Sequence, residues 1–151
     1  MKTFKYRLQA LLNLKEHRER EKQKEHATAL QQVMNQTDRL KKIEGYKQDT
    51  YIDQRYKMTS NISVAELLVY SRYLLKLKRD RLTGEELLRV LEKNTEEKRQ
   101  ELIEASKQRQ IHEKLREKQQ ERYDAEVRLI MTKENDETAA DNYLRRERNK
   151  D

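Results

Sequence analysis

Histidines and carboxylates are the residues of this chain that could do acid–base or metal chemistry. The histidines are His17, His26 and His112, and an imidazole can serve as a general base or a metal ligand. His17 and His26 share one face of a helix, but at nine residues apart they are about 13 Å from each other. That distance is too long for a shared metal ion. We therefore expect three exposed helix histidines and no metal site.

Carboxylates are plentiful, with 28 Asp and Glu residues, and paired carboxylates can act as general acid and base. Such catalysis needs pKa values perturbed by a desolvating pocket, which a rod of two helices does not offer. The sequence has no glycine-rich phosphate loop, and it has no cysteine for thiol catalysis, disulfides or a thiolate metal site. These features predict a protein that is not an enzyme and that uses no cofactor.

The composition predicts long helices. Of 151 residues, 42% are charged and 34% hydrophobic, proline is absent, and glycine occurs only at Gly45 and Gly84. Ordinary globular domains are roughly 25% charged and 45–50% apolar, and their turns favour Gly and Pro. High charge with low hydrophobicity also marks disordered chains. However, apolar residues recur here at helical spacing and charges of both signs are mixed, so we prefer extended helices to disorder.

A net charge of +7 raises the question of a nucleic-acid partner. The basic residues are interleaved with acidic ones, as in Glu16 to Lys22, which is typical of a solvated, ion-paired helix surface. Only the tail from Arg145 to Lys150 is locally basic. No nucleic acid is expected as a partner. The sequence also lacks a secretory signal and the ~20 apolar residues of a membrane span, which favours a soluble cytoplasmic protein.

A first helix is expected at about 3–56, with Thr3 as a plausible N-cap. Its clearest apolar seam has residues spaced three and four apart. The seam residues are Leu30, Val33, Thr37 and Leu40, and Met34 and Ile43 widen the stripe. Gly45 lies inside this helix at a cost of about 1 kcal/mol relative to alanine. It could mark a bend or a close approach between helices.

An irregular tip is expected at about 57–63, and a second helix at about 64–146. Ser63-Val64-Ala65-Glu66 is a capping box, in which the serine and the glutamate satisfy each other's backbone N–H groups. Gly84 either lies in a continuous helix or produces a slight kink. Farther on, the apolar spacing slips between Ala105 and Ile111, which predicts a local change in supercoiling.

Two long helices with one short break predict an all-α fold: a long antiparallel two-helix coiled-coil hairpin, forming a single elongated domain over 1–151. In this hairpin the Leu30–Leu40 stretch should face about Leu91–Ala105. Residues 4–14 should lie beside the C-terminal segment. An apolar opening, Phe4 to Leu14, followed by the polar block Lys15 to His26, predicts that this end docks onto another protein.

Tyrosines and aliphatic residues gather around the expected tip: Tyr46, Tyr51, Tyr56, Tyr70 and Tyr73, with Ile43, Ile52, Leu74 and Leu77. Two readings stay open. These residues form a small local core closed by the turn, or they form a partner-binding patch, since tyrosine is enriched at interfaces.

Three stretches together resemble the FliJ family of flagellar type III export proteins. The start, Phe4-Lys5-Tyr6-Arg7-Leu8-Gln9 with Leu11-Leu12-x-Leu14-Lys15, is similar to the start of that family. Met58-x-x-x-Ile62-Ser63-Val64-x-Glu66 with Tyr70-x-x-Tyr73-x-x-x-Leu77 resembles its middle. Glu113-Lys114-Leu115-Arg116-Glu117-Lys118-Gln119 and Lys133-x-x-Asp136-Glu137-x-Ala139 resemble its C-terminal half. The resemblance covers essentially the whole chain.

The resemblance implies a stalk whose joined termini enter the hexameric export ATPase ring, FliI, and promote its assembly and activity. It also implies contact with the membrane-embedded export gate protein, FlhA, and escort of flagellar export chaperones. Such a protein would be cytoplasmic and peripherally associated, through its partners, with the inner face of the membrane at the flagellar base.

The resemblance also assigns residues. It suggests an ATPase-ring contact at Phe4, Arg7, Leu8, Leu11 and Leu12, with Asp136 and Glu137 across the pair. It suggests an export-gate contact at Ile43, Tyr46, Tyr73 and Leu77. This sequence has Thr50 and Asp80 where the family would have a second aromatic and a small residue. The alternatives are a structural coiled-coil scaffold, an injectisome stalk homologue and a basic nucleic-acid binder.

Overall fold

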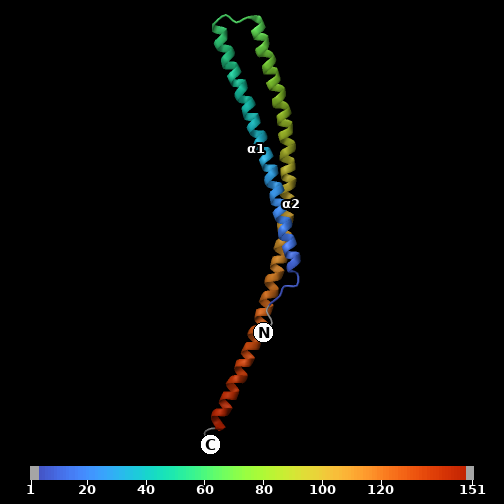
Figure 1. The fold of residues 1–151 in the computed structure, drawn as a ribbon, viewed down its shortest axis with the longest axis vertical. Helices are drawn as coiled ribbons and strands as arrows, with labels where there is room; N and C mark the ends of the chain where they lie inside the picture. The colour runs from blue at the N-terminus through green and yellow to red at the C-terminus, as the bar shows by residue number, and fades with distance from the viewer. Residues whose placement is uncertain (1–3, 149–151) are drawn as a thin grey trace. The chain divides into compact units, whose positions relative to one another are not determined.

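The computed structural model describes residues 4–148, and within them the chain forms two helices and no strand. Helix α1 spans Gln9–Thr59 and helix α2 spans Val64–Arg148. The two pack against each other as an antiparallel helical hairpin (Figure 1). The predicted all-α hairpin is therefore confirmed.

Helix α1 begins later than the sequence suggested. Thr3, the expected N-cap, lies outside the described residues, and residues 4–8 are not helical. The backbone turns at Tyr6, whose carbonyl accepts from Gln9 N at 3.2 Å, and the first helical bond runs from Leu12 N to the Leu8 carbonyl at 3.0 Å. Leucine is a poor capping residue, so no local signal marks this start.

The connection between the helices is shorter than expected, at residues 60–63. The predicted capping box is confirmed. Ser63 N donates to Glu66 Oε2 at 2.9 Å, and Glu66 N donates back to Ser63 Oγ at 3.2 Å. The Ser63 backbone N–H, followed by the Ser63 hydroxyl, which also donates to Glu66 Oε2 at 2.9 Å, holds the pKa of the Glu66 carboxyl below its ordinary value. Helix α2 therefore starts where its sequence dictates.

The chain divides into two compact units, named here the turn unit, Glu19–Ala105, and the terminal unit, which comprises described residues 4–18 and 106–148. Within the turn unit, the buried and half-buried residues recur every three or four positions, which is the heptad spacing of a coiled coil. On α1 they include Glu19, Lys22, His26, Ala29, Val33, Gln36, Leu40, Ile43, Lys47, Thr50 and Gln54. On α2 they include Leu67, Tyr70, Leu74, Leu77, Arg81, Gly84, Leu88, Leu91, Thr95, Lys98, Leu102 and Ala105.

Polar residues hold many of these seam positions, which is why the apolar pattern misled the sequence reading. Leu30 and Met34, assigned to the seam, are 43% and 60% exposed, whereas Val33 and Leu40 are half-buried. The expected phase slip after Ala105 is also wrong. The half-buried positions of α2 continue regularly through Leu102, Ala105, Arg109 and His112, and Ile111 points to solvent.

Gly84, and not Gly45, is the point of close approach between the helices. A Cβ at Gly84 would lie 2.8 Å from Leu40 Cδ2, while a Cβ at Gly45 would meet nothing within 4 Å. Helix α2 continues through Gly84 without a break. Leu40 therefore faces Gly84, so the expected pairing of Leu30–Leu40 with Leu91–Ala105 is shifted by several residues.

In the terminal unit, the N-terminal segment packs along α2. The Tyr6 side chain is buried and its hydroxyl donates to the His112 carbonyl at 3.3 Å. The Phe4 and Tyr123 rings lie 5.6 Å apart. Residues 128–145 of α2 are exposed at every position. Asp136 and Glu137 were expected across the pair from the opening segment, but they lie in this unpaired stretch, because the N-terminal segment pairs with the region from His112 to Tyr123.

Candidate functional site

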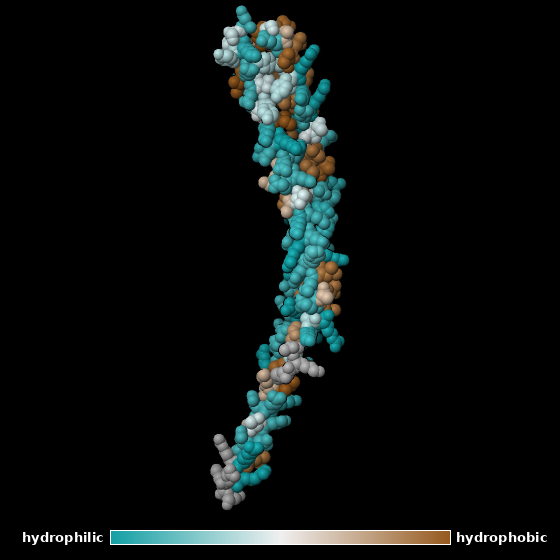
Figure 2. Space-filling model, viewed as in Figure 1, coloured by the Kyte–Doolittle hydropathy of each residue, from teal (hydrophilic) through white to brown (hydrophobic). Residues whose placement is uncertain are grey.

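The tyrosines near the connection form a largely exposed surface of the turn unit. Tyr46, Tyr51, Tyr56 and Tyr73 are exposed and only Tyr70 is half-buried. Hydrophobic side chains gather around this end of the unit in the space-filling view (Figure 2). The reading of a closed local core is therefore wrong for most of these residues. What they supply is amphipathic area of the kind found at protein interfaces.

One polar bridge does close the helices near the connection. The Tyr70 hydroxyl donates to a carboxylate oxygen of Asp53, and the Lys57 ammonium lies 5.6 Å from the centre of the Tyr70 ring. The Tyr70 side chain, followed by the Asp53 carboxylate, raises the pKa of Lys57 above its ordinary value. This polar bridge links α1 to the first turns of α2.

The four residues expected at the export gate divide into two kinds. Tyr46 and Tyr73 present 53% and 40% of their surface to solvent. Ile43 is half-buried and Leu77 is buried in the helix pair. Tyr73 borders a shallow depression that also holds Asp49, Thr50, Asp53, Val69 and Tyr70. A partner at this patch would thus meet two tyrosines, with Leu77 supporting them from within.

An interhelical layer of four charges replaces apolar contacts farther along the turn unit. Lys22 Nζ lies 2.7 Å from Glu101 Oε2, and Lys98 Nζ lies 2.9 Å from Glu25 Oε2. The pKa values of Glu101 and Glu25 are lowered, first by hydrogen bonds from Lys22 and Lys98 respectively. The pKa values of both lysines are raised, chiefly by the same bonds. This layer aligns the helices through charge pairing.

The residues expected at the ATPase ring lie in the terminal unit, but they differ in what they can offer. Leu8 and Arg7 are exposed, and Phe4 and Leu11 are half-buried. Leu12 is only 1% exposed, the most deeply buried large side chain of the described chain. A partner cannot reach it. Asp136 and Glu137 lie on the exposed stretch of α2. Sequence reasoning missed Tyr6, whose hydroxyl anchors the opening segment. The available signal was an aromatic residue between two charged ones.

The histidines differ from the expectation of three exposed side chains. His17 is exposed, whereas His26 and His112 are half-buried at seam positions. The Nδ1 atom of His112 is buried and finds no hydrogen-bond partner among the described residues. Within residues 4–148, no three or more His, Asp or Glu side chains are grouped so that they could hold a metal ion.

Comparison with protein families decides the assignment. A family model described as flagellar FliJ protein matches residues 4–148, which is the whole described range. The chain belongs to this family. Membership of the FliJ family gives the chain a role in flagellar protein export. Its partners therefore lie in the export machinery.

The other two comparisons gave no match, either to curated proteins or to solved structures. Along the described part of the chain, neither helix has a stretch long and apolar enough to cross a membrane.

Proposed function

We propose that this FliJ family member is a non-enzymatic stalk that docks its terminal unit into the ring of the hexameric export ATPase, FliI, and promotes ring assembly and ATP turnover. The observation that carries the proposal is the family match over residues 4–148. The form of the terminal unit supports it, because α2 has exposed faces from 128 to 145. A bare helix of this kind has all of its sides available to a surrounding ring.

The contact set of the terminal unit follows from exposure. We assign the ring contact to Phe4, Arg7, Leu8 and Leu11, together with Asp136 and Glu137. Leu12 has a supporting role, since its burial fixes the first turns of α1 on α2. Apolar residues at the start of α1 would contribute buried area, and the two carboxylates would pair with basic groups of the ring.

We further propose that the turn unit contacts the export gate protein, FlhA, through Tyr46 and Tyr73, supported from within by Ile43 and Leu77, and that the chain escorts export chaperones. Exposed tyrosines support the gate contact, because tyrosine is common among residues that dominate binding energy. The protein would be cytoplasmic. Its partners would hold it at the inner face of the membrane at the flagellar base.

The proposal is tested by ATP turnover of the cognate export ATPase with and without this chain. Leu8→Asp combined with Leu11→Asp should remove most of the stimulation, because both changes place charge in the contact. Leu82→Asp combined with Val90→Asp is the matched control, since these leucine and valine side chains are exposed in the turn unit. Equal stimulation by both double variants would show that the docking surface has been assigned to the wrong place.

A structural scaffold is the second candidate function, supported by the regular heptad seam of both helices. A scaffold of this type would pair with copies of itself. Sedimentation at micromolar concentrations separates the two candidates, because a stalk that enters a ring should remain a monomer.

A further inference from the structure

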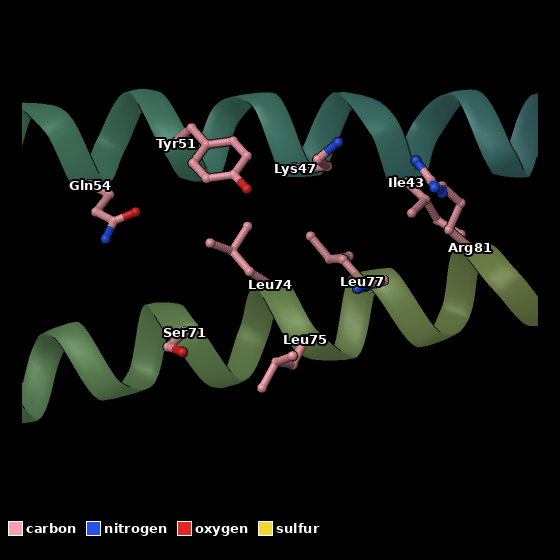
Figure 3. Close-up of a pocket in the computed structure, with 10 residues that line it drawn as sticks. Ile43, Lys47, Tyr51, Gln54, Ser71, Leu74, Leu75, Leu77 and Arg81 are labelled. Atoms are coloured by element: carbon pink, nitrogen blue, oxygen red, sulfur yellow. The ribbon is translucent and has the colours of Figure 1, made fainter.

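A groove runs along the turn unit on the flank away from Tyr73. Its volume is about 530 Å³, and it lies between residues 43–54 of α1 and residues 71–81 of α2. Tyr51 and Leu74 face each other across it, and Leu75 points away from α1 along its outer edge (Figure 3). Together with Ile43 and Leu77 they give the groove an apolar floor.

This groove and the depression beside Tyr73 are separate surfaces. On a helix with 3.6 residues per turn, Asp49 and Asp53 project to one side of Thr50, and Tyr51 and Gln54 project to the other. The depression beside Tyr73 is lined by Asp49 and Asp53, while the groove is lined by Tyr51 and Gln54. The groove therefore lies on the flank opposite Tyr73, and only Ile43 and Leu77, which are buried or half-buried between the helices, belong both to its floor and to the residues proposed to support the gate contact.

The charge of the groove is one-sided. The residues that line it include Lys47, Lys78 and Arg81 and no carboxylate. Lys47 and Arg81 each pair with a glutamate of their own helix, Glu44 at 3.3 Å and Glu85 at 3.4 Å. No ion pair of Lys78 is found within the described chain. The depression on the other flank has the opposite character, with two aspartates and no basic residue.

The basic character extends over the whole α2 side of the groove. The stretch 71–81 contains five basic residues and one acidic residue. Arg72, Lys76 and Arg79 line a depression with Leu75, which the one acidic residue of the stretch, Asp80, also borders. This stretch departs from the mixed charges that cover most of the chain. An apolar floor with basic edges is complementary to an apolar stripe with acidic edges.

We propose that this groove binds one amphipathic helix of a partner protein, with apolar residues at i, i+3, i+4 and i+7 and Asp or Glu residues beside them. Two helices cannot cover the apolar residues between them on both flanks, whereas a third helix laid in the groove would complete a three-helix bundle. Helix-in-groove recognition works in this way. The concave position of Leu74 and Tyr51 favours an inserted helix over a flat membrane surface.

Binding of a defined peptide to the full chain tests the proposal. The probe is a fluorescent helical peptide of about 18 residues, five helical turns, with leucine at the stripe positions and glutamate beside them. A second peptide carries lysine in place of each glutamate. We expect saturable binding of the acidic peptide, monitored by fluorescence anisotropy, and no binding of the basic one. Equal binding of the two peptides would overturn the proposal.

Charge variants locate the binding. Lys78→Glu and Ser71→Glu should each weaken binding of the acidic peptide by roughly tenfold or more, as expected for like charges at a contact. Lys41→Glu makes the same charge change at an exposed position outside the groove and should leave the affinity within about twofold. Tyr73→Ala, on the other flank, should also have no effect on the peptide. If Lys41→Glu weakens binding as much as Lys78→Glu, the attraction is non-specific and the groove is not the site.

A photocrosslinking amino acid at Ser71 of the full chain identifies the occupant in cells. We expect crosslinks to a segment of another protein in which Asp and Glu outnumber Lys and Arg beside an apolar stripe. Crosslinks confined to a second copy of this chain would replace the proposal with self-association. Binding to phosphatidylglycerol vesicles that is lost in Lys78→Glu would assign the surface to lipid instead. Because the exposed gate residue Tyr73 lies on the other flank, either result leaves the proposed gate contact through Tyr46 and Tyr73 untouched.

Discussion

The side-chain amide of Gln36 donates a hydrogen bond of 3.0 Å to the backbone carbonyl of Gly84, across the two helices of the turn unit. Gln36 is only 6% exposed, so its amide has little access to water and depends on this bond. Glycine suits this contact, since a Cβ at residue 84 would lie 2.8 Å from Leu40 Cδ2 and 3.0 Å from Gln36 Nε2, so those side chains would have to shift. A polar residue and a glycine thus fix the register where an apolar pair would be expected.

Alanine at the two glycines should change stability in opposite directions. Gly45→Ala places a methyl group in open space and should raise the free energy of unfolding by about 1 kcal/mol through helix propensity. Gly84→Ala gains the same propensity, but it displaces Leu40 and separates Gln36 from its acceptor, at a cost of about 1–3 kcal/mol. We expect a net loss of about 1 kcal/mol. Urea unfolding followed by circular dichroism measures both, and a stabilised Gly84→Ala variant would contradict this packing.

The four-charge layer predicts how stability depends on pH. The carboxyl pKa values of Glu25 and Glu101 are lowered below their ordinary value of 4.5. Their contribution is therefore present above that pH and is lost as the pH falls through the lowered values. The lysine pKa values are raised above 10.5, so the lysine contribution is present below that pH and is lost as the pH rises through the raised values. Urea midpoints should be highest between these limits and should fall with added salt.

A charge exchange provides the control for this layer. Glu25→Lys alone should lower the urea midpoint at neutral pH, because it puts three positive charges together with Glu101. Glu25→Lys combined with Lys98→Glu restores the opposite charges and should recover most of the loss. A double variant no more stable than the single one would show that these charges do not interact across the helices.

The architecture could be predicted from the sequence, but the seam could not. Absence of proline and the Ser63 capping box were enough to place two helices and the connection. The register depends on Gln36, Gly84, Lys22 and Lys98, whose types are as common on exposed faces, so counting apolar residues assigned Leu30 and Met34 to the seam instead. The start of α1 was missed as well. The segment before it is held by a hydrogen bond from the Tyr6 hydroxyl to a backbone carbonyl that is distant in the sequence.

The exposure of the candidate site residues could not be predicted from the sequence. The opening segment and the tyrosines near the connection both emerged from the sequence. Burial of Leu12 and Leu77 could not be foreseen, since an amphipathic helix pattern does not tell which leucine lies nearest the partner helix. The groove beside Tyr51 and its basic edge appeared only when α1 and α2 were placed together.

Loss of the capping serine should destabilise the hairpin without disturbing the seam. Ser63→Ala removes the hydroxyl that accepts from Glu66 N and should lower the free energy of unfolding by about 1 kcal/mol. Ser60→Ala is the matched control, because Ser60 is exposed in the same connection. Thermal unfolding compares the two variants. If Ser60→Ala is equally destabilising, the effect belongs to the connection and not to the cap.

An apolar residue at seam position 112 should stabilise the terminal unit. His112→Leu removes the buried Nδ1 atom that finds no partner among the described residues and should raise the free energy of unfolding by about 1 kcal/mol. Ile111→Leu adds no buried area, since Ile111 is exposed, and should change the free energy by less than about 0.5 kcal/mol. If the Ile111 variant had the larger effect, the apolar phase slip would be real and the regular seam wrong.

Variants of the proposed gate contact should affect FlhA binding and folding stability separately. Tyr46→Ala and Tyr73→Ala remove exposed rings, so each should weaken binding to the cytoplasmic part of FlhA by about tenfold, or about 1.4 kcal/mol, with little change in unfolding. Leu77→Ala removes a buried side chain and should instead lower the free energy of unfolding by roughly 2–5 kcal/mol. Calorimetric titration and urea unfolding measure the two effects. Tyr51→Ala is the control, because Tyr51 is exposed on the other flank; weaker FlhA binding by this variant would move the gate contact to the groove.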